Sequence, residues 1–345
     1  MLDDLAYIHE RDVDDALGVV EKQWQQLEGT VELVGNTAFG AVDNVIHAGM
    51  GGSALPALIA QSWPPTSVPF MVVRNYDLPS WVDQKTLVIC DSVSGNTEET
   101  LEALHQAEAK GAQIAVITGG GALQKAAEAK QYALAVLPKV SQPRYAVLAN
   151  YKALLTILDA AKALASTTWA EDIQSAARYL KNQTSKWRAD VPTKDNQAKQ
   201  IAQELMGKSV VIYSGPKLFP AAYKWKISFN ENAKHIAWVN QLPEFNHNEF
   251  IGWSKQPVDK PYAVIDLRST LEHPQVQKRF EVSAKLLSGV RPEPIVVTVQ
   301  GETLLEQLFW GSALGDFVSI YLALLNGLNP SPVDLVEKFK QTLAA

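Results

Sequence analysis

Apolar and polar positions alternate in short blocks along most of this 345-residue chain. Short apolar runs bounded by turn residues predict buried strands, and the segments between them repeat at helical spacing. The predicted strands cover residues 43–50, 70–73, 86–90, 114–117, 132–137, 209–213, 262–267 and 294–299. Strands that alternate with helices pair in parallel through right-handed crossovers, so the pattern predicts an α/β fold.

Helices are predicted between and after these strands, and the polar first 35 residues predict a helical lead-in. The predicted helices cover residues 54–63, 97–110, 146–186, 221–229, 316–325 and 333–343. Because the strand–helix pattern recurs after residue 196, we expect two similar halves, each a mainly parallel, doubly wound sheet flanked by helices. The predicted parts are a first domain at 1–160, a helical connection at 161–195 and a second domain at 196–345.

Bulk composition narrows the classes of function. The net charge of -6 and pI near 5.6 argue against a nucleic-acid partner, which needs a basic face. The single cysteine, Cys90, lies in an apolar run and predicts a buried, inert thiol in a reducing compartment. The start lacks the pattern of a signal peptide, and we see no apolar stretch near the roughly 20 residues that span a bilayer. We therefore expect a soluble, cytoplasmic protein without a membrane partner.

Two loops that follow predicted strands place hydroxyls beside glycines. The first holds Gly51, Gly52 and Ser53, and the second is Ser92-Val93-Ser94-Gly95-Asn96-Thr97. Ligands bind beyond the carboxyl ends of parallel strands, and helix N-termini favour anions, so these loops suit a phosphate monoester. Ordinary helix capping by Ser53 and Thr97 is the alternative. Neither loop is a P-loop, and the glycine spacing does not fit a dinucleotide, so we expect no nucleotide cofactor.

The segment from residue 226 to residue 253 is dense in polar groups and contains Glu231 and His247. A carboxylate can move a proton between C1 and C2 of an aldose phosphate through a cis-enediol, and a histidine can open the sugar ring. A fixed cation would stabilise the enediolate oxygen. Alternatively, Glu231 is a surface residue and His247 a loop residue. No histidine pair shows the spacing of metal ligands, so we expect no metal.

Taken together, the ordered motifs resemble those of the bifunctional phosphoglucose/phosphomannose isomerases, which are built from two sugar-isomerase (SIS) domains. The resemblance covers nearly the whole chain. The motifs are Gly49-Met50-Gly51-Gly52-Ser53; Ser92 through Thr100; Pro143-Arg144; Asn230-Glu231-Asn232 through His247-Asn248-Glu249; and Asp316 through Ser319, leading to Leu328-Asn329-Pro330 and Lys340. Val93 and Asn329 depart from the family, which often has tyrosine and aspartate there, and this leaves the choice between glucose and mannose epimers open.

The resemblance implies a role for each matched residue. The phosphate would be held by Ser53, Ser92, Ser94 and Thr97 together with Gly51 and Gly52. Glu231 would be the base at C1 and C2, Arg144 would stabilise the enediolate, and Lys340 would lie near the ring oxygen. His247 would open the ring, reaching in from the partner subunit of a homodimer. Glu244 and Glu249 would position the His247 loop.

Three functions therefore compete. The first is an isomerase that interconverts fructose 6-phosphate with glucose 6-phosphate and mannose 6-phosphate without a cofactor. The second is a non-catalytic sugar-phosphate sensor, but Glu231, His247 and Arg144 are all present and no DNA-binding appendage is visible. The third is an amino-sugar phosphate isomerase or lyase, against which the segment from Pro243 to Glu249 argues.

Overall fold

The computed structural model describes residues 1–255 and 261–343 and divides the chain into two compact units. The N-terminal unit is Gln23–Arg178, and the C-terminal unit combines Met1–Lys22 with Tyr179–Ala345. The first 22 residues thus fold with the second half of the chain. The domain boundaries at residues 160 and 195 stay a prediction.

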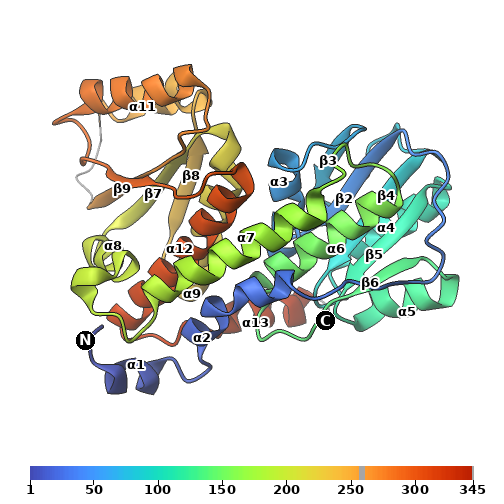
Figure 1. Cartoon of the computed structure of the whole chain (residues 1–345), viewed down its shortest axis with the longest axis horizontal. Helices are drawn as coiled ribbons and strands as arrows, with labels where there is room; N and C mark the ends of the chain where they lie inside the picture. The colour runs from blue at the N-terminus through green and yellow to red at the C-terminus, as the bar shows by residue number, and fades with distance from the viewer. Residues whose placement is uncertain (256–260, 344–345) are drawn as a thin grey trace. The chain divides into compact units, whose positions relative to one another are not determined.

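A six-stranded sheet forms the N-terminal unit, in the order β1-β6-β5-β4-β2-β3 (Figure 1). Its strands are β1 (Leu33–Val34), β2 (Asn44–Gly49), β3 (Phe70–Val73), β4 (Thr86–Ser92), β5 (Gln113–Thr118) and β6 (Ala133–Val136). All pairs are parallel except β1 with β6, so the parallel strands predicted for this half are confirmed. The chain turns from β2 to β3 on one side and continues into β4 on the other, which makes the carboxyl edge between β2 and β4 the switch point where ligands bind.

Helices cover both faces of this sheet. They are α3 (Leu55–Ser62), α4 (Glu98–Ala109), α5 (Gly121–Lys130) and α6 (Val147–Ala160). Ile46, Val88 and Cys90 pack with α4 and α5, while α3 and α6 pack together against the opposite face. The buried position predicted for Cys90 is confirmed, and burial raises the pKa of its thiol to about 12.

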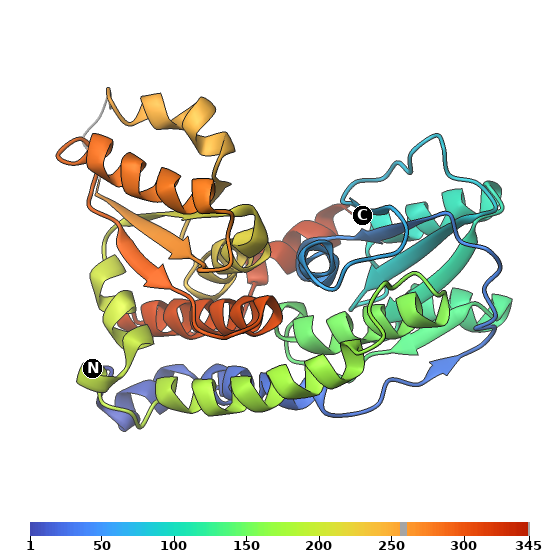
Figure 2. The ribbon, with the colours of Figure 1, turned by 45° about the horizontal axis from the view of Figure 1, so that its top comes forward.

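The C-terminal unit contains a four-stranded parallel sheet in the order β10-β9-β7-β8. Its strands are β7 (Ser209–Ser214), β8 (Ala237–Gln241), β9 (Tyr262–Arg268) and β10 (Ile295–Thr298). One face packs against α9 (Phe219–Asn232) and α12 (Leu304–Leu325), and α11 (Pro274–Leu287) covers the other (Figures 1 and 2). The strands predicted for this half are confirmed, and β8 is an edge strand that the pattern missed.

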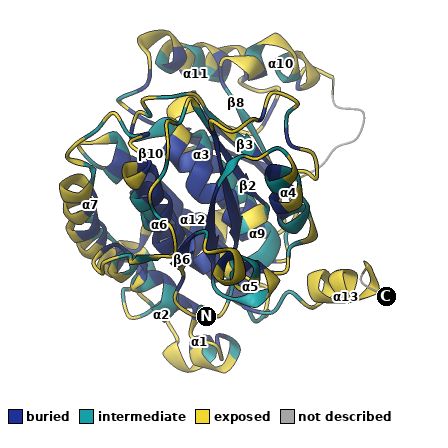
Figure 3. Cartoon of the chain, turned by 90° about the vertical axis from the view of Figure 1, so that its right-hand side faces the viewer, coloured by how far each residue is buried: buried dark blue, intermediate teal, exposed yellow. Residues whose placement is uncertain are grey.

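Helix α12 corrects two expectations. It begins twelve residues before the predicted start at Asp316, and by length and composition it is long and apolar enough to cross a membrane. The expectation that no apolar stretch approaches that length is therefore wrong. Every residue of the helix from Gln307 to Leu325 is buried, and Figure 3 shows α12 in the colour of buried residues. Its glycines resemble helix breakers in the sequence, but a Cβ at Gly315 would lie 2.3 Å from the Trp225 ring, so glycine allows α9 to pack closely.

The helix predicted over residues 146–186 is two helices, α6 and α7 (Trp169–Thr184). Lys162 adopts a left-handed conformation with φ of 56° and ends α6. The next residues form backbone hydrogen bonds with another loop, from Ser67 N to Ala163 O and from Ala165 N to Pro65 O. These pairings compete with continued helix and explain the break.

The first 22 residues of the predicted helical lead-in are mainly helical and pack within the C-terminal unit. Helices α1 (Leu5–Arg11) and α2 (Ala16–Glu21) bury apolar side chains, and α2 contacts α12. The buried ammonium of Lys199 donates to the carbonyl oxygens of Leu2, Ala189 and Val191 and to the Asp3 carboxylate, at 2.7–3.2 Å. This cage attaches the start of the chain to its second half.

Candidate functional site

Hydroxyl groups converge at the carboxyl edge between β2 and β4. The Ser92 Oγ lies 2.7 Å from the Thr97 Oγ1 and 3.3 Å from the Ser94 Oγ. The backbone N–H of Val93 donates to the Ser53 Oγ at 3.2 Å, which joins the two loops. The structure therefore brings the predicted phosphate-binding hydroxyls together at the switch point of the sheet.

The capping alternative is wrong for both loops. Thr97 occupies the N-cap position of α4 but makes no capping hydrogen bond, and Ala54 rather than Ser53 is the N-cap of α3. Within the described residues, no side chain caps the N-terminus of α4. Its backbone N–H groups and its dipole therefore remain available to an anion beside the hydroxyls.

Arg144 lies in a short 3₁₀ turn, η3 (Pro143–Tyr145), that packs against the first loop. A Cβ at Gly52 would lie 3.2 Å from the Pro143 carbonyl carbon and 3.3 Å from the Arg144 nitrogen, so this close approach favours glycine. The guanidinium is 1% exposed, lies 4.7 Å from the centroid of the Tyr145 ring and donates to the Gln142 side chain. Arg144 is thus a fixed cation beside the loop that contains Gly51, Gly52 and Ser53.

The corresponding position in the C-terminal unit is filled by a carboxylate of the chain itself. After β7 the backbone N–H of Lys217 donates to the Glu272 Oε1 at 2.8 Å. A Cβ at Gly215 would lie 2.2 Å from the same oxygen. Burial raises the pKa of Glu272. At this strand end, Glu272 thus accepts the backbone N–H of the loop, a position where a carboxylate of the chain leaves no room for a bound anion.

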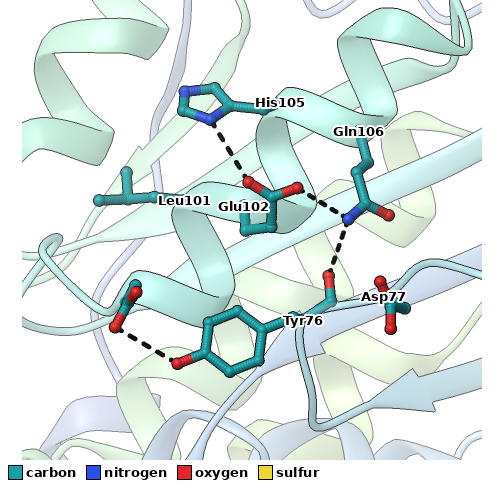
Figure 4. A pocket seen from close by; sticks show the side chains of 7 residues that line it. Tyr76, Asp77, Leu101, Glu102, His105 and Gln106 are labelled. Atoms are coloured by element: carbon teal, nitrogen blue, oxygen red, sulfur yellow. Dashed lines mark hydrogen bonds and ion pairs between the residues drawn. The ribbon is translucent and has the colours of Figure 1, made fainter.

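A surface hollow borders α4 near the second loop and is shown in Figure 4. The Tyr76 hydroxyl donates to Glu98, and the Gln106 amide donates to Glu102 and to the Tyr76 carbonyl oxygen. The lining residues are Tyr76, Asp77, Glu98, Leu101, Glu102, His105 and Gln106. Three carboxylates make the hollow unsuitable for a phosphate.

Glu231 is half-buried in the last turn of α9, in the C-terminal unit. Buried polar groups fix this helix to α12. Lys224 and Ser228 both donate to the Asp316 carboxylate, and the Asn232 amide donates to the Ser319 Oγ at 2.8 Å. The sequence analysis placed Asp316 and Ser319 in a motif without assigning them a role. The structure shows that they fix the position of the helix that contains Glu231.

His247 is exposed at the end of a 3₁₀ turn, η7 (Glu244–His247), and the short helix α10 (Glu249–Gly252) follows. The Glu249 carboxylate accepts hydrogen bonds from the Tyr213 hydroxyl and, at 2.6 Å, from the Asn240 amide. Glu244 accepts a hydrogen bond from Asn248. Both glutamates therefore brace the turn, and Tyr213 and Asn240 are supports that the sequence analysis missed.

Lys340 lies on α13 (Asp334–Leu343), a helix with no buried residue, and its ammonium is ion-paired with Glu337 at 2.7 Å (Figure 3). Leu335 and Phe339, on the same helix, are 81% and 65% exposed. The structure thus gives Lys340 a solvated position, and its role stays a prediction.

Two mainly parallel sheets flanked by helices, with hydroxyls gathered at the strand ends of the first, fit a protein of the SIS-domain class. A family model described as the bacterial phospho-glucose isomerase C-terminal SIS domain matches residues 194–343. A solved glucose-6-phosphate isomerase like protein from Thermus thermophilus is similar in fold, with a TM-score of 0.66 and 18% identity over 99% of this chain and 98% of the other.

Curated relatives refine this class. A bifunctional phosphoglucose/phosphomannose isomerase from Aquifex aeolicus is 31% identical, over 87% of this chain and 90% of its own length. One with the same name from Caldicellulosiruptor bescii is 33% identical, over 88% and 90%. The chain belongs to the family of bifunctional phosphoglucose/phosphomannose isomerases.

Proposed function

We propose that this chain is an aldose–ketose isomerase that interconverts fructose 6-phosphate with glucose 6-phosphate and mannose 6-phosphate. The supporting observation is the convergence of uncharged hydroxyls at the switch point of the N-terminal sheet, in a member of this family. We also propose that the reaction needs neither metal nor nucleotide, because a carboxylate base with a fixed cation suffices to move a proton through an enediol.

Ser53, Ser92, Ser94 and Thr97, with the amides of Gly51 and Gly52, bind the phosphate in this mechanism. Their neutral donors hold the dianion without an ion pair. The Arg144 guanidinium, fixed beside the glycine loop, stabilises the negative charge that develops on the enediolate oxygen.

Glu231 is the proposed base. It removes the proton from C1 of open-chain fructose 6-phosphate, and the C–H electron pair forms the C1–C2 double bond of a cis-enediol as the C2 carbonyl pair moves onto O2. The O1 proton passes to O2, and the same carboxyl returns the first proton to C2, which leaves an aldehyde at C1. His247 opens the ring of the cyclic substrate, and Lys340 acts near the ring oxygen.

A homodimer is the proposed assembly, with His247 supplied by the partner subunit. His247 is exposed, and apolar side chains close to it in sequence are exposed as well, namely Trp238 at 49% and Ile251 at 71%. A partner would bury such residues. We also propose a cytoplasmic location, for which the single, buried cysteine is the support.

The first test is a coupled assay of the purified protein with chelator present, in which fructose 6-phosphate is supplied and the glucose and mannose products are measured separately. Both products are expected. Binding of the sugar phosphate without turnover would favour the sensor instead, and turnover of an amino-sugar phosphate alone would favour the amino-sugar isomerase.

Variants test the assigned roles. Glu231→Gln should lower kcat by about 10²- to 10⁴-fold while inorganic phosphate still inhibits, because base and phosphate site are separate. His247→Ala should slow cyclic substrate more than open-chain substrate. Equal losses on both substrates would remove the ring-opening role.

Coexpression of the two variants tests the shared site. A mixed dimer of Glu231→Gln with Ala-substituted His247 (His247→Ala) has one complete site of its two only if His247 serves the partner. Because random pairing makes about half of the dimers mixed, we expect recovery of about a quarter of the wild-type rate. No recovery, with mixed dimers confirmed by mass spectrometry, would mean that His247 acts within its own chain.

A further inference from the structure

A fully buried carboxylate, Asp91, lies directly below the proposed phosphate site. It is 0% exposed at the end of β4, immediately before Ser92. Its Oδ2 lies 3.0 Å from the Nε2 of His47, and its Oδ1 accepts a hydrogen bond from the Asn150 amide at 2.9 Å. Both partners are also buried. None of these three residues belongs to the set assigned above.

The partners of Asp91 come from the segments that contain the assigned residues of this unit. His47 is in β2, the strand that leads into Gly51, and Asn150 is in the first turns of α6, just after Arg144. The backbone oxygen of Asp91 is 3.4 Å from the hydroxyl of Thr100 in α4. Asp91 therefore connects β4 with β2, which leads into the glycine loop, with α6, which follows the arginine turn, and with α4, which follows the hydroxyl loop.

Stability alone does not account for this arrangement. Burying a carboxylate is costly unless it is paired, and apolar residues of similar size commonly serve a core as well or better. Moreover, the Nδ1 of His47 and the Oδ1 of Asn150 have no hydrogen-bond partner among the described residues. Unsatisfied buried groups of this kind call for an explanation other than packing.

We propose that Asp91 is a positioning residue for the phosphate site. Its two oxygens fix β2 and α6 relative to β4, and so set the spacing of Ser53 and Arg144 from the Ser92 hydroxyl. The proposal deepens the proposed function and rests on it. It assigns Asp91 no contact with substrate.

The test compares Asp91→Ala with Asp91→Asn and with a matched control, Thr86→Val. Thr86 is a buried residue at the opposite end of β4, with a hydroxyl that is hydrogen-bonded to Asp83. Asp91→Ala should raise the KM for fructose 6-phosphate and the inhibition constant of inorganic phosphate about tenfold, with a smaller change in kcat, because a displaced loop weakens binding. Asp91→Asn keeps one acceptor and one polar group in place and should restore most of the affinity.

Thr86→Val should lower thermal stability with KM unchanged, which separates positioning from general loss of stability. If Asp91→Ala does not fold, Asn150→Ala, which leaves the carboxylate and His47 in place, should raise the same two constants. If Asp91→Ala or Asn150→Ala has the same KM and the same inhibition constant for phosphate as the Thr86→Val control, the proposal is overturned.

Direct titration with inorganic phosphate distinguishes this failure from failure of the proposed function. A wild-type protein that binds phosphate without turnover removes the isomerase, but the ratio of phosphate Kd between wild type and Asp91→Ala still decides the positioning role. A wild-type protein with full isomerase activity and unchanged Asp91 variants removes the positioning role alone.

Discussion

Removal of one hydroxyl, by Tyr213→Phe, tests the support of the His247 turn. The Tyr213 side chain is 1% exposed, and its hydroxyl donates to Glu249 and accepts from the Trp253 indole N–H at 2.9 Å. Burial, aided by Glu249, raises the pKa of Tyr213, so the hydroxyl stays protonated and donating at all ordinary pH values.

The expected cost follows from these two bonds. A hydrogen bond to a charged acceptor contributes about 1.5–3 kcal/mol, and the buried indole N–H left without an acceptor adds about 1–3 kcal/mol. A loss of about 3 kcal/mol would lower the Tm of a domain of this size by about 6–12 °C. Because Glu249 keeps only its Asn240 partner, we also expect slower turnover of cyclic substrate.

Calorimetry gives the Tm, and the coupled assay gives rates on cyclic and open-chain substrate. Tyr262→Phe is the matched control, since Tyr262 packs on the ring of Trp253 at 5.4 Å but its hydroxyl makes no hydrogen bond to any described residue. A Tm for Tyr213→Phe within about 2 °C of this control, with unchanged rates, would refute the reasoning.

Three further predictions concern other parts of the chain. Lys199→Met should lower the free energy of unfolding by about 3–5 kcal/mol, since three carbonyl oxygens in buried or part-buried hydrogen bonds lose their donor, and limited proteolysis should then cut near residues 1–22. The raised pKa of Glu272 means that its contribution to stability is present below its unfolded value of 4.5 and is lost as pH rises through the folded value. Glu272→Gln should therefore flatten the fall in urea-unfolding free energy as pH rises above about 4.5. An unchanged slope would show that burial does not raise the pKa of this carboxyl. Gly52→Ala should displace the Pro143–Arg144 peptide by a few tenths of an ångström and raise KM severalfold, and a crystal structure without that shift would contradict the contact argument.

The helix predictions failed where packing overrode local pattern. Gly315 looks like an interruption of a helix, yet it lies inside α12 because the Trp225 ring of α9 packs too closely for a side chain there. Residues 161–168 resemble continued helix, yet they form backbone hydrogen bonds with a loop almost 100 residues away. In both cases the deciding partner is distant in sequence.

In the candidate site, too, local sequence predicted some features and contacts between distant residues decided others. The loops that contain Ser53 and Ser92 could be found from glycines and hydroxyls at strand ends, because those residue types reflect local backbone geometry. The sequence offered no means of choosing between capping and anion binding for Thr97. The structure removed capping, because the Thr97 hydroxyl points to Ser92 instead of the helix N–H groups, and anion binding stays a prediction.

By itself, the sequence determined the alternation of strands and helices, the parallel sheets and the positions of the hydroxyl loops, because each of these depends on the pattern of neighbouring residues. Only the tertiary structure decided which side chains meet. The contacts of His47 and Asn150 with Asp91, and of Tyr213 with Glu249, join residues 36 to 59 positions apart. Such contacts depend on strand order and on which face each side chain occupies, and no local pattern specifies these before the chain has folded.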